Sequence, residues 1–283
     1  MFKIVQRSCL APGVHRFEVE APLVAGAAKA GNFVIVRTAE RGERIPLTIA
    51  GADRERGTIT LVVQEVGKST MEMGQLEAGD AFRDLLGPLG TPTRIERVDN
   101  LVAVAGGIGV APLLPVIRAH KEAGSRVTTI VGARTKDLLI MCDEVEAASH
   151  EVVYATDDGS YGYHGFVTGA LQRLLEAGCK FDQAIAIGPV RMMQAVCKVT
   201  AKHDIPTIVS LNAVMVDGTG MCGCCRVTVD GEVKFSCVDG PDFDGHKVDF
   251  DELCARQAFF CDEERVAKDR YQRGEGACRC QER

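Results

Sequence analysis

Over its first hundred residues the chain alternates short apolar runs with turn residues. Gly, Pro, Asn and Asp separate these runs, which are rich in β-branched and aromatic side chains, as expected for strands joined by tight turns. The clearest runs are FKIVQ (2–6), HRFEVEA (15–21), NFVIVRT (32–38) and TITLVVQEV (58–66). Regularly spaced short strands of this kind predict a small β-barrel or sandwich over residues 1–98.

Near residue 100 the pattern changes to continuous apolar runs that alternate with helical segments. The apolar runs occupy residues 101–105, 127–131, 152–156, 184–187 and 207–211. Between them, residues 112–124 and 167–178 have a helical pattern that ends at a glycine, and residues 189–203 have one that begins at a proline. The alternation predicts an α/β domain over residues 99–211, with a parallel sheet and helices on both faces.

After residue 211 the regular order breaks down. Glycines and cysteines crowd together before the stretch CRVTVDGEVKFSC (225–237), in which Asp230-Gly231 predicts a hairpin turn. A polar tail follows. We therefore expect a small, irregular third lobe over residues 212–283.

Composition and charge exclude several classes of function. Hydrophobic residues make up 46% of the chain and charged residues 25%, with a net charge of −6 and no basic stripe, which argues against nucleic-acid binding. The N-terminus lacks the basic and apolar segments of a signal peptide. The uncharged stretch 101–117 is shorter than the ~20 residues of a membrane span, and it contains glycines and prolines. These features predict a cytoplasmic protein without membrane contact.

The cysteines indicate metal or redox chemistry. The chain has 12, five of them between Cys222 and Cys254, and without an export signal disulfides are not expected. The segment DGTGMCGCC (217–225) is followed by Cys237, whereas plant-type [2Fe-2S] proteins use C-x4-C-x2-C and a distant fourth cysteine. We predict that the cluster ligands are Asp217, Cys222, Cys225 and Cys237.

Two alternatives to this ligand set stay open. Cys224 could be the fourth ligand, with Asp217 serving only as a turn residue. The cysteines could instead bind structural zinc, which prefers four Cys or Cys/His ligands.

A glycine loop follows the first apolar run of the α/β region. Gly106-Gly107-Ile108-Gly109 leads into a predicted helix through Ala111 and Pro112. Glycines allow a pyrophosphate to approach the backbone closely, and a helix N-terminus offers free N–H groups to it. We interpret the loop as a dinucleotide site, although a tight turn without a ligand has the same pattern.

The segment VAGGIGVAPLLP (104–115) resembles the nicotinamide-domain signature of ferredoxin–NADP reductase-type flavoproteins. Two further pieces follow in the order of that family, GART (132–135) and Gly188-Pro189. The resemblance implies that the first lies near the adenosine ribose of NAD(H) and the second beside the nicotinamide. Asp157 and Asp158 follow a predicted strand, where such sheets bind ligands. The candidate NAD(H) residues are Gly106, Gly107, Ile108, Gly109, Ala111, Pro112, Arg134, Asp157, Asp158, Gly188 and Pro189.

The same family binds FAD in an N-terminal barrel, through an Arg followed closely by a small polar residue at a strand end. RIPLT (44–48) matches that motif, and GKST (67–70) matches the turn that cradles the phosphates. The resemblance implies that Arg44 pairs with the FAD pyrophosphate and that Thr48 faces the flavin N5 region. The candidate FAD residues are Arg44, Pro46, Leu47, Thr48, Val63, Gln64, Gly67, Lys68, Ser69 and Thr70.

A barrel, a nicotinamide domain and a C-terminal cluster loop in this order resemble the electron-transfer subunit of dihydroorotate dehydrogenase, which has four cysteines in the loop. The version with Asp217 resembles the small (alpha) subunit of NADH-dependent reduced ferredoxin:NADP oxidoreductase, also called a sulfide dehydrogenase subunit. ERIPLTI, QEVGKSTMEM, ATDDGSYG and DGTGMCGCCRV carry this likeness.

The likeness implies that electrons move between NAD(H), FAD and a [2Fe-2S] cluster. It also implies a heterodimer with a larger glutamate-synthase-like flavin and iron–sulfur subunit that performs electron bifurcation and connects to ferredoxin. The non-enzyme alternative is a zinc-binding sensor or interaction module on a reductase-like fold.

Overall fold

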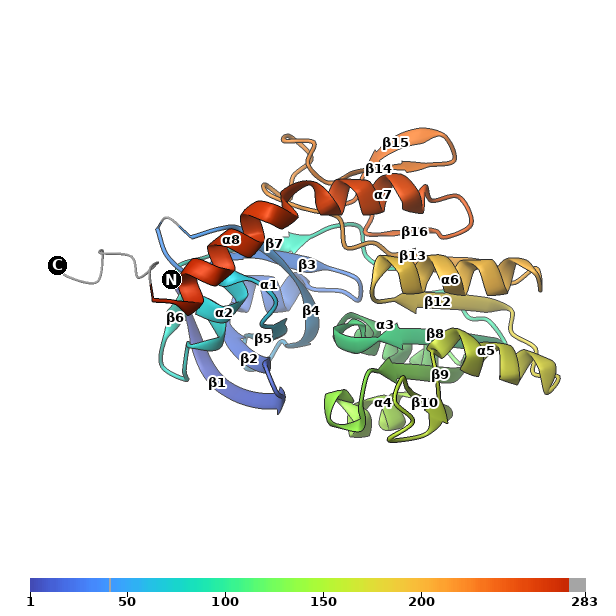
Figure 1. Ribbon diagram of the computed structural model, residues 1–283. Coiled ribbons are helices and arrows are strands. Elements are labelled where there is room, and N and C mark those ends of the chain that lie inside the picture. Colours follow the sequence, from blue (N-terminus) through green and yellow to red (C-terminus); the bar gives the residue numbers. More distant parts are fainter. Residues whose placement is uncertain (41, 275–283) are drawn as a thin grey trace.

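The computed structural model describes residues 1–40 and 42–274. Figure 1 shows an antiparallel sheet that curls into a barrel, a twisted sheet flanked by helices, and a C-terminal lobe above both. The predicted fold class, a β-barrel plus an α/β domain and a small lobe, is confirmed. Cys278 and Cys280 lie outside the described residues.

The barrel is a seven-stranded antiparallel sheet with the order β6-β1-β2-β5-β4-β3-β7. Its core holds Phe17 and Phe82 edge to face, with ring centroids 5.9 Å apart. Two short helices accompany the sheet, α1 (Pro22–Ala27) and α2 (Lys68–Gly74). The strands are β1 (Phe2–Ala11), β2 (Val14–Glu20), β3 (Phe33–Arg37), β4 (Ile45–Asp53), β5 (Thr58–Gln64), β6 (Ala81–Phe82) and β7 (Asp84–Leu89).

The second sheet has the order β11-β10-β9-β8-β12-β13-β16. Its strands are parallel except β16, which pairs antiparallel with β13. The strand order reverses at β8, and ligands of such sheets bind at the carboxyl ends of the strands near this point. The strands are β8 (Asn100–Gly106), β9 (Arg126–Ala133), β10 (Glu151–Thr156), β11 (Tyr163–His164), β12 (Gln183–Ile187), β13 (Thr207–Ser210) and β16 (Asp242–Asp244).

Helices cover both faces of this sheet, as predicted. One face carries α3 (Val110–Glu122) and α4 (Cys142–Ala148), which bury Leu101, Ala103 and Ala105 of β8. The other carries α5 (Val167–Glu176) and α6 (Val190–Ala201), over Val102 and Val104. Because neighbouring side chains of β8 point to opposite faces and both faces are covered, its residues 101–105 are all apolar. Two single-turn helices, η1 (Gly107–Gly109) and η2 (Lys136–Leu138), follow β8 and β9.

The C-terminal lobe contains the predicted hairpin, β14 (Arg226–Val229) and β15 (Glu232–Phe235). Asp230 and Gly231 both have positive φ, 55° and 75°, which suits the tight turn between these strands. The polar tail is helical where the sequence pattern predicted no element: α7 (Phe250–Gln257), η3 (Ala258–Phe260) and α8 (Cys261–Gln272). Among the described residues, no helix combines the length and apolar character needed to cross a membrane.

Candidate cofactor sites

The glycine loop after β8 is packed against the turn after β12. A Cβ at Gly109 would overlap the carbonyl oxygen of Ile187, and one at Gly188 would lie 3.0 Å from the Gly106 nitrogen. Gly107 differs, because it has a φ of +55° and a Cβ added there would have no heavy atom within 4 Å. Gly106, Gly109 and Gly188 therefore allow the two turns to touch. Gly107 leaves its backbone open to a ligand at the carboxyl edge of the sheet.

A polar rim lies at the ends of β9 and β10. The backbone N–H of Asp158 donates to the Arg134 carbonyl at 3.2 Å, so these two segments adjoin. The Asp158 carboxylate accepts bonds from the hydroxyl and the N–H of Ser160, which lowers its pKa. The Lys136 ammonium lies 5.5 Å from the ring centroid of Tyr161. Cationic, acidic and aromatic groups thus meet where the adenosine end of a dinucleotide is expected.

The flavin motif lies at the start of β4, along its pairing with β3. Thr48 is opposite Phe33, Leu47 opposite Val34, and Pro46 opposite Ile35. Arg44 precedes the strand, is exposed and forms no ion pair with a described residue. Its guanidinium is free to bind an anion.

The second flavin segment begins α2 and lies beside the first. The Thr70 hydroxyl accepts the N–H groups of Val66 (2.9 Å) and Gly67 (3.0 Å), which caps the helix. The Ser69 hydroxyl donates to the carboxylate of Glu43. Since Glu43 precedes Arg44, this bond joins the two predicted flavin segments. Sequence reasoning missed Glu43, although its place beside the arginine motif was visible.

Val63 and Gln64, at the end of β5, were predicted to border the flavin or the adenine. The Val63 side chain is fully buried in the barrel core, so only its backbone is available to a ligand. Gln64 is half-buried and marks the end of the strand, just before the turn into α2.

The cluster loop, residues 217–225, brings Cys225 together with a second predicted ligand, Cys237, which follows the β14–β15 hairpin. Cys225 and Cys237 are buried, with sulfur atoms 3.1 Å apart, and burial raises the pKa of the Cys237 thiol to about 12. Cys222 is exposed. The Asp217 carboxylate accepts the backbone N–H groups of Thr219 (2.9 Å) and Cys222 (2.8 Å), which lower its pKa to about 2.

The donor chemistry of this loop fits an iron–sulfur cluster. Within residues 1–40 and 42–274, no three metal-binding side chains converge on one point. Asp217, Cys222 and Cys225 nevertheless share a loop whose glycines at 218, 220 and 223 have positive φ, and Cys237 reaches it from the end of the β14–β15 hairpin. Both Asp217 oxygens bond to backbone, as the turn-residue alternative expects, yet a carboxylate oxygen has lone pairs left for a metal.

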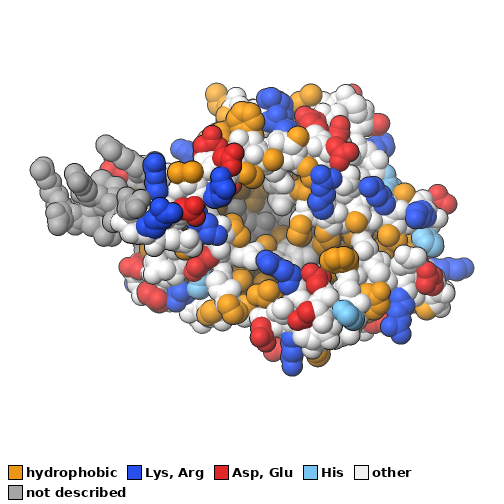
Figure 2. Space-filling view, viewed as in Figure 1, with side chains coloured by type: hydrophobic (Ala, Val, Ile, Leu, Met, Phe, Trp, Pro, Cys, Tyr) orange, Lys and Arg blue, Asp and Glu red, His pale blue; other side chains and the backbone are white. Residues whose placement is uncertain are grey.

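The cluster loop rests directly on the barrel wall. Gly218 has a φ of +75°, and a Cβ there would lie 2.7 Å from Leu89 Cδ1 and 2.9 Å from Ile35 Cγ1. Ile35 is the β3 partner of Pro46 in the flavin motif. A single strand therefore separates the two candidate cofactor sites. Figure 2 shows the surface hollowed where the barrel, the parallel sheet and the lobe meet.

Comparisons with known proteins agree with this arrangement. Residues 103–198 match an oxidoreductase NAD-binding domain, and residues 212–249 match the iron–sulfur cluster binding domain of dihydroorotate dehydrogenase B. The dihydroorotate dehydrogenase B (NAD(+)) electron transfer subunit homolog of Thermotoga maritima is 46% identical over 95% of both chains. The electron transfer subunit of Desulforamulus reducens is 34% identical over 87% of this chain and 96% of its own.

This chain belongs to the family of dihydroorotate dehydrogenase B electron transfer subunits and their homologs.

Solved structures extend the likeness of this family member to three dimensions. A chain of the NADH-dependent reduced ferredoxin-NADP oxidoreductase structure is 45% identical, with a TM-score of 0.91 over 96% of this chain and 98% of that one. The cytochrome b5 reductase domain of Ulva prolifera nitrate reductase, at 19% identity and a TM-score of 0.57 over 72% of this chain and 92% of that one, shares the fold. The predicted family resemblance is confirmed.

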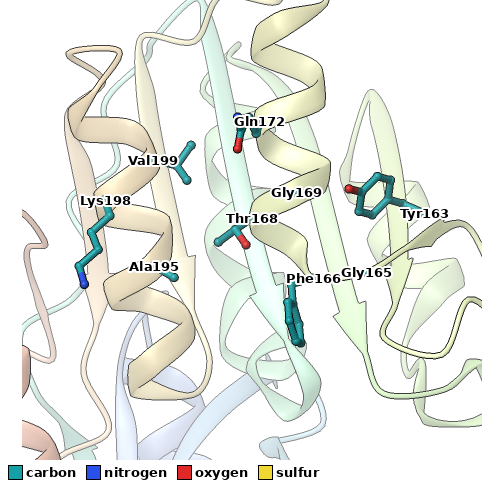
Figure 3. Close-up of a pocket in the computed structure, with 9 residues that line it drawn as sticks. All are labelled: Tyr163, Gly165, Phe166, Thr168, Gly169, Gln172, Ala195, Lys198 and Val199. Carbon is teal, nitrogen blue, oxygen red and sulfur yellow. The ribbon is translucent and has the colours of Figure 1, made fainter.

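A separate shallow depression lies between α5 and α6. Figure 3 shows it lined by Tyr163, Phe166 and Lys198, among others. None of the predicted cofactor residues lines it. The depression therefore adds nothing to the flavin, nicotinamide or cluster sites of this family member.

Proposed function

We propose that the chain is the electron-transfer subunit of an NADH-dependent reduced ferredoxin:NADP oxidoreductase. In this proposal residues 1–98 hold FAD, residues 99–211 hold NAD(H), and residues 212–283 hold a [2Fe-2S] cluster. FAD, when bound, supplies the conversion between two-electron transfer with a nicotinamide and one-electron transfer with a cluster.

The observation that carries the proposal is the contact of Gly218 with Ile35 and Leu89. It sets the cluster loop against the strand that pairs with the flavin motif. A structural zinc site would have no need to adjoin that strand, whereas electron transfer requires neighbouring cofactors. The same packing keeps water out between the two sites, because Ile35 is buried.

The residues of each loop have defined tasks in this proposal. Arg44 would pair with the FAD pyrophosphate as a forked donor, and the first N–H groups of α2, which begins at Lys68, would be offered to it. Gly107 lets the NAD(H) pyrophosphate approach the backbone. Gly188 and Pro189 lie beside the nicotinamide. No side chain is required as a catalytic acid or base.

Asp217 completes the proposed ligand set with Cys222, Cys225 and Cys237. A carboxylate is a harder donor than a thiolate, so the Asp217→Cys variant should keep the cluster and change its reduction potential. Cys224→Ser tests the alternative ligand. If Cys224→Ser lost the iron and Asp217→Ala kept it with an unchanged EPR spectrum, Cys224 would replace Asp217 in the set.

A partner subunit is part of the proposal, because the relatives are named electron transfer subunits. We propose a larger glutamate-synthase-like flavin and iron–sulfur subunit that exchanges electrons with ferredoxin and supports bifurcation. The cluster loop suits a docking surface, since Met221 is 90% exposed beside Cys222, and Val216 and Val238 are also exposed. The cytoplasmic location stays a prediction.

The first test is a measurement of iron, sulfide, zinc and flavin in the full chain, purified without oxygen. We expect about two irons and one FAD per chain, and a [2Fe-2S] EPR signal after reduction by NADH. Zinc without flavin would overturn the electron-transfer function and leave the sensor alternative.

Dihydroorotate dehydrogenase is the second candidate, favoured by the names of several relatives. It predicts that the complex with the partner reduces NAD(+) with dihydroorotate. The leading proposal predicts no such activity, and NADP(+) reduction by NADH with reduced ferredoxin instead. One assay with both electron donors separates the two candidates.

A further inference from the structure

The C-terminal arm, which we define as α7, η3 and α8, spans two candidate cofactor sites. It begins at Phe250, where the match to the cluster-binding domain has ended at residue 249. Figure 1 shows it running from the lobe across the barrel, so that α8 reaches the side where α2 lies. The arm thus lies outside both matched domains, and it contacts the cluster loop at one end and the flavin turn of the barrel at the other.

Each end of the arm is bonded to the backbone of a candidate cofactor loop. At the near end, the Arg256 guanidinium donates to the carbonyl of Cys224 at 3.1 Å, in the cluster loop. At the far end, the Lys268 ammonium donates to the carbonyl of Val66 at 3.1 Å. Val66 immediately precedes the GKST turn. The two bonds connect loops that are more than 150 residues apart in the chain.

Helix α8 has no apolar stripe to explain its position. None of its residues is fully buried, and a polar helix of 12 residues is marginal by itself in water. Its half-buried residues are Ala267, Lys268 and Tyr271, which share one face, and Tyr271 lies near enough to Glu72 and Lys68 of α2 to sense their charges. Specific contacts with α2 and the turn before it therefore hold the helix.

The same turn is also fixed from the barrel side. The buried His15 bonds to the Glu65 carboxylate at 2.6 Å, and the Glu65 backbone N–H donates to the Gly13 carbonyl at 2.8 Å. Lys268 adds the contact from the opposite side, through the carbonyl next to Glu65. Residues 65–70 are thus held between the barrel and α8.

We propose that α8 clamps the 66–70 turn and so retains the FAD pyrophosphate, with Lys268 as a positioning residue. The inference rests on the proposed function, because it takes FAD as the occupant of the turn. Lys268 acts through the Val66 carbonyl and fixes the turn that leads into α2, whose first backbone N–H groups would face the phosphates. When that bond is absent, the turn opens more easily and FAD leaves faster.

The test compares full-length variants at Lys268 by the rate of FAD release on dilution, followed by flavin fluorescence. Lys268→Met keeps the apolar stem and removes the donor, and we expect release about tenfold faster, the effect of losing one charge-assisted hydrogen bond. Lys268→Arg keeps a donor and should restore slow release. Arg270→Ala, on the same helix, is the control for lost charge and should release FAD at the wild-type rate.

A second pair of variants tests the helix as a whole. A chain that ends at Phe260 lacks α8 and should release FAD at least as fast as Lys268→Met. A chain that ends at Gly274 keeps α8 and should release FAD at the wild-type rate. Iron content should be unchanged in Lys268→Met. Wild-type release rates in both Lys268→Met and the chain ending at Phe260 would overturn the clamp alone. A wild-type chain that takes up no FAD would overturn the proposed function and the clamp together.

Discussion

The two glycine-rich loops of this protein are built in different ways. The loop at 106–109 joins a buried parallel strand to a helix, and its glycines meet the backbone of the neighbouring turn. The cluster loop at 217–225 has no regular element and is held by the Asp217 turn, by Gly218 on the barrel wall and by the buried Cys225–Cys237 pair. The first loop is shaped by the sheet, and the second by a few side chains.

This difference implies that the nicotinamide site is formed before its ligand binds, whereas the cluster site is completed by its cofactor. The nicotinamide loop needs no ligand to keep its shape, because the loop follows β8, the turn that it touches follows β12, and these two strands are paired. The cluster loop has two thiols in place and an exposed third, Cys222. Metal–thiolate bonds contribute folding free energy in such sites. We expect the cluster loop, and not the nicotinamide loop, to depend on its cofactor for order.

The strongest test of the comparison removes a buried thiol. Cys225→Ala should abolish iron and sulfide binding entirely, because it takes away one of the two sulfurs already in contact. NADH affinity should stay within about twofold of wild type, since the nicotinamide loop is formed by the sheet alone. Iron analysis and NADH titration of the same sample measure both effects.

Cys197→Ala is the matched control, because Cys197 is a buried thiol on α6 that is not among the predicted cluster ligands. It should keep about two irons per chain. Full iron in Cys225→Ala, or its loss in Cys197→Ala, would contradict the ligand assignment.

A smaller effect is expected when methyl groups are added to the nicotinamide loop. Gly109→Ala places a Cβ against the Ile187 carbonyl and should lower the free energy of unfolding by about 3 kcal/mol. Gly107→Ala meets no neighbouring atom but keeps a left-handed φ, so it should cost only about 1 kcal/mol. Urea denaturation measures both.

For NADH binding we expect the reverse order, with Gly107→Ala having the larger effect. A methyl at Gly107 occupies the open side of the loop and should weaken NADH binding about tenfold in the folded protein. If Gly107→Ala bound NADH as wild type does, the open backbone would have no part in the dinucleotide site.

Sequence patterns predicted the regular parts of the fold for a physical reason. Strands buried on one or two faces leave period-two or continuous apolar runs, and Asp230-Gly231 has the turn chemistry of a hairpin. The arm was missed because α8 carries no apolar stripe. Strand β16 is three residues of DFD, too short and too polar to stand out.

The sequence predicted which segments form the candidate sites, but it did not predict how these segments contact one another. Glycine patterns and cysteine spacing located the loops along the chain. The contact of Gly218 with Ile35, and the bond that joins Ser69 to Glu43, depend on how the chain folds back over itself. Residues far apart in sequence carry no local pattern that shows such contacts.

The smallest expected effect concerns how the lobe is attached to the rest of the molecule. The nicotinamide loop is anchored by apolar strands, whereas the lobe adds polar contacts with the barrel exit to its apolar packing on Ile35 and Leu89. The Thr93 hydroxyl donates to the Asp242 carboxylate at 2.6 Å, and the Thr91 hydroxyl donates to the Val238 carbonyl at 2.8 Å. Because Asp242 is ionisable, we expect the attachment of the lobe to be sensitive to pH.

Burial raises the pKa of Asp242 above its usual value of 3.8. The folded protein therefore keeps a proton on Asp242 at pH values where the unfolded chain has released it, so stability falls as the pH rises from about 4 to the folded pKa. Asp242→Asn keeps an acceptor for Thr93 without the charge, and should be more stable than wild type by about 1 kcal/mol at pH 7. The difference should shrink at pH 4. Asp244→Asn on the same strand is the control, and urea denaturation at both pH values decides the matter: an equal difference at pH 4 and pH 7 would mean that the junction does not sense pH through Asp242.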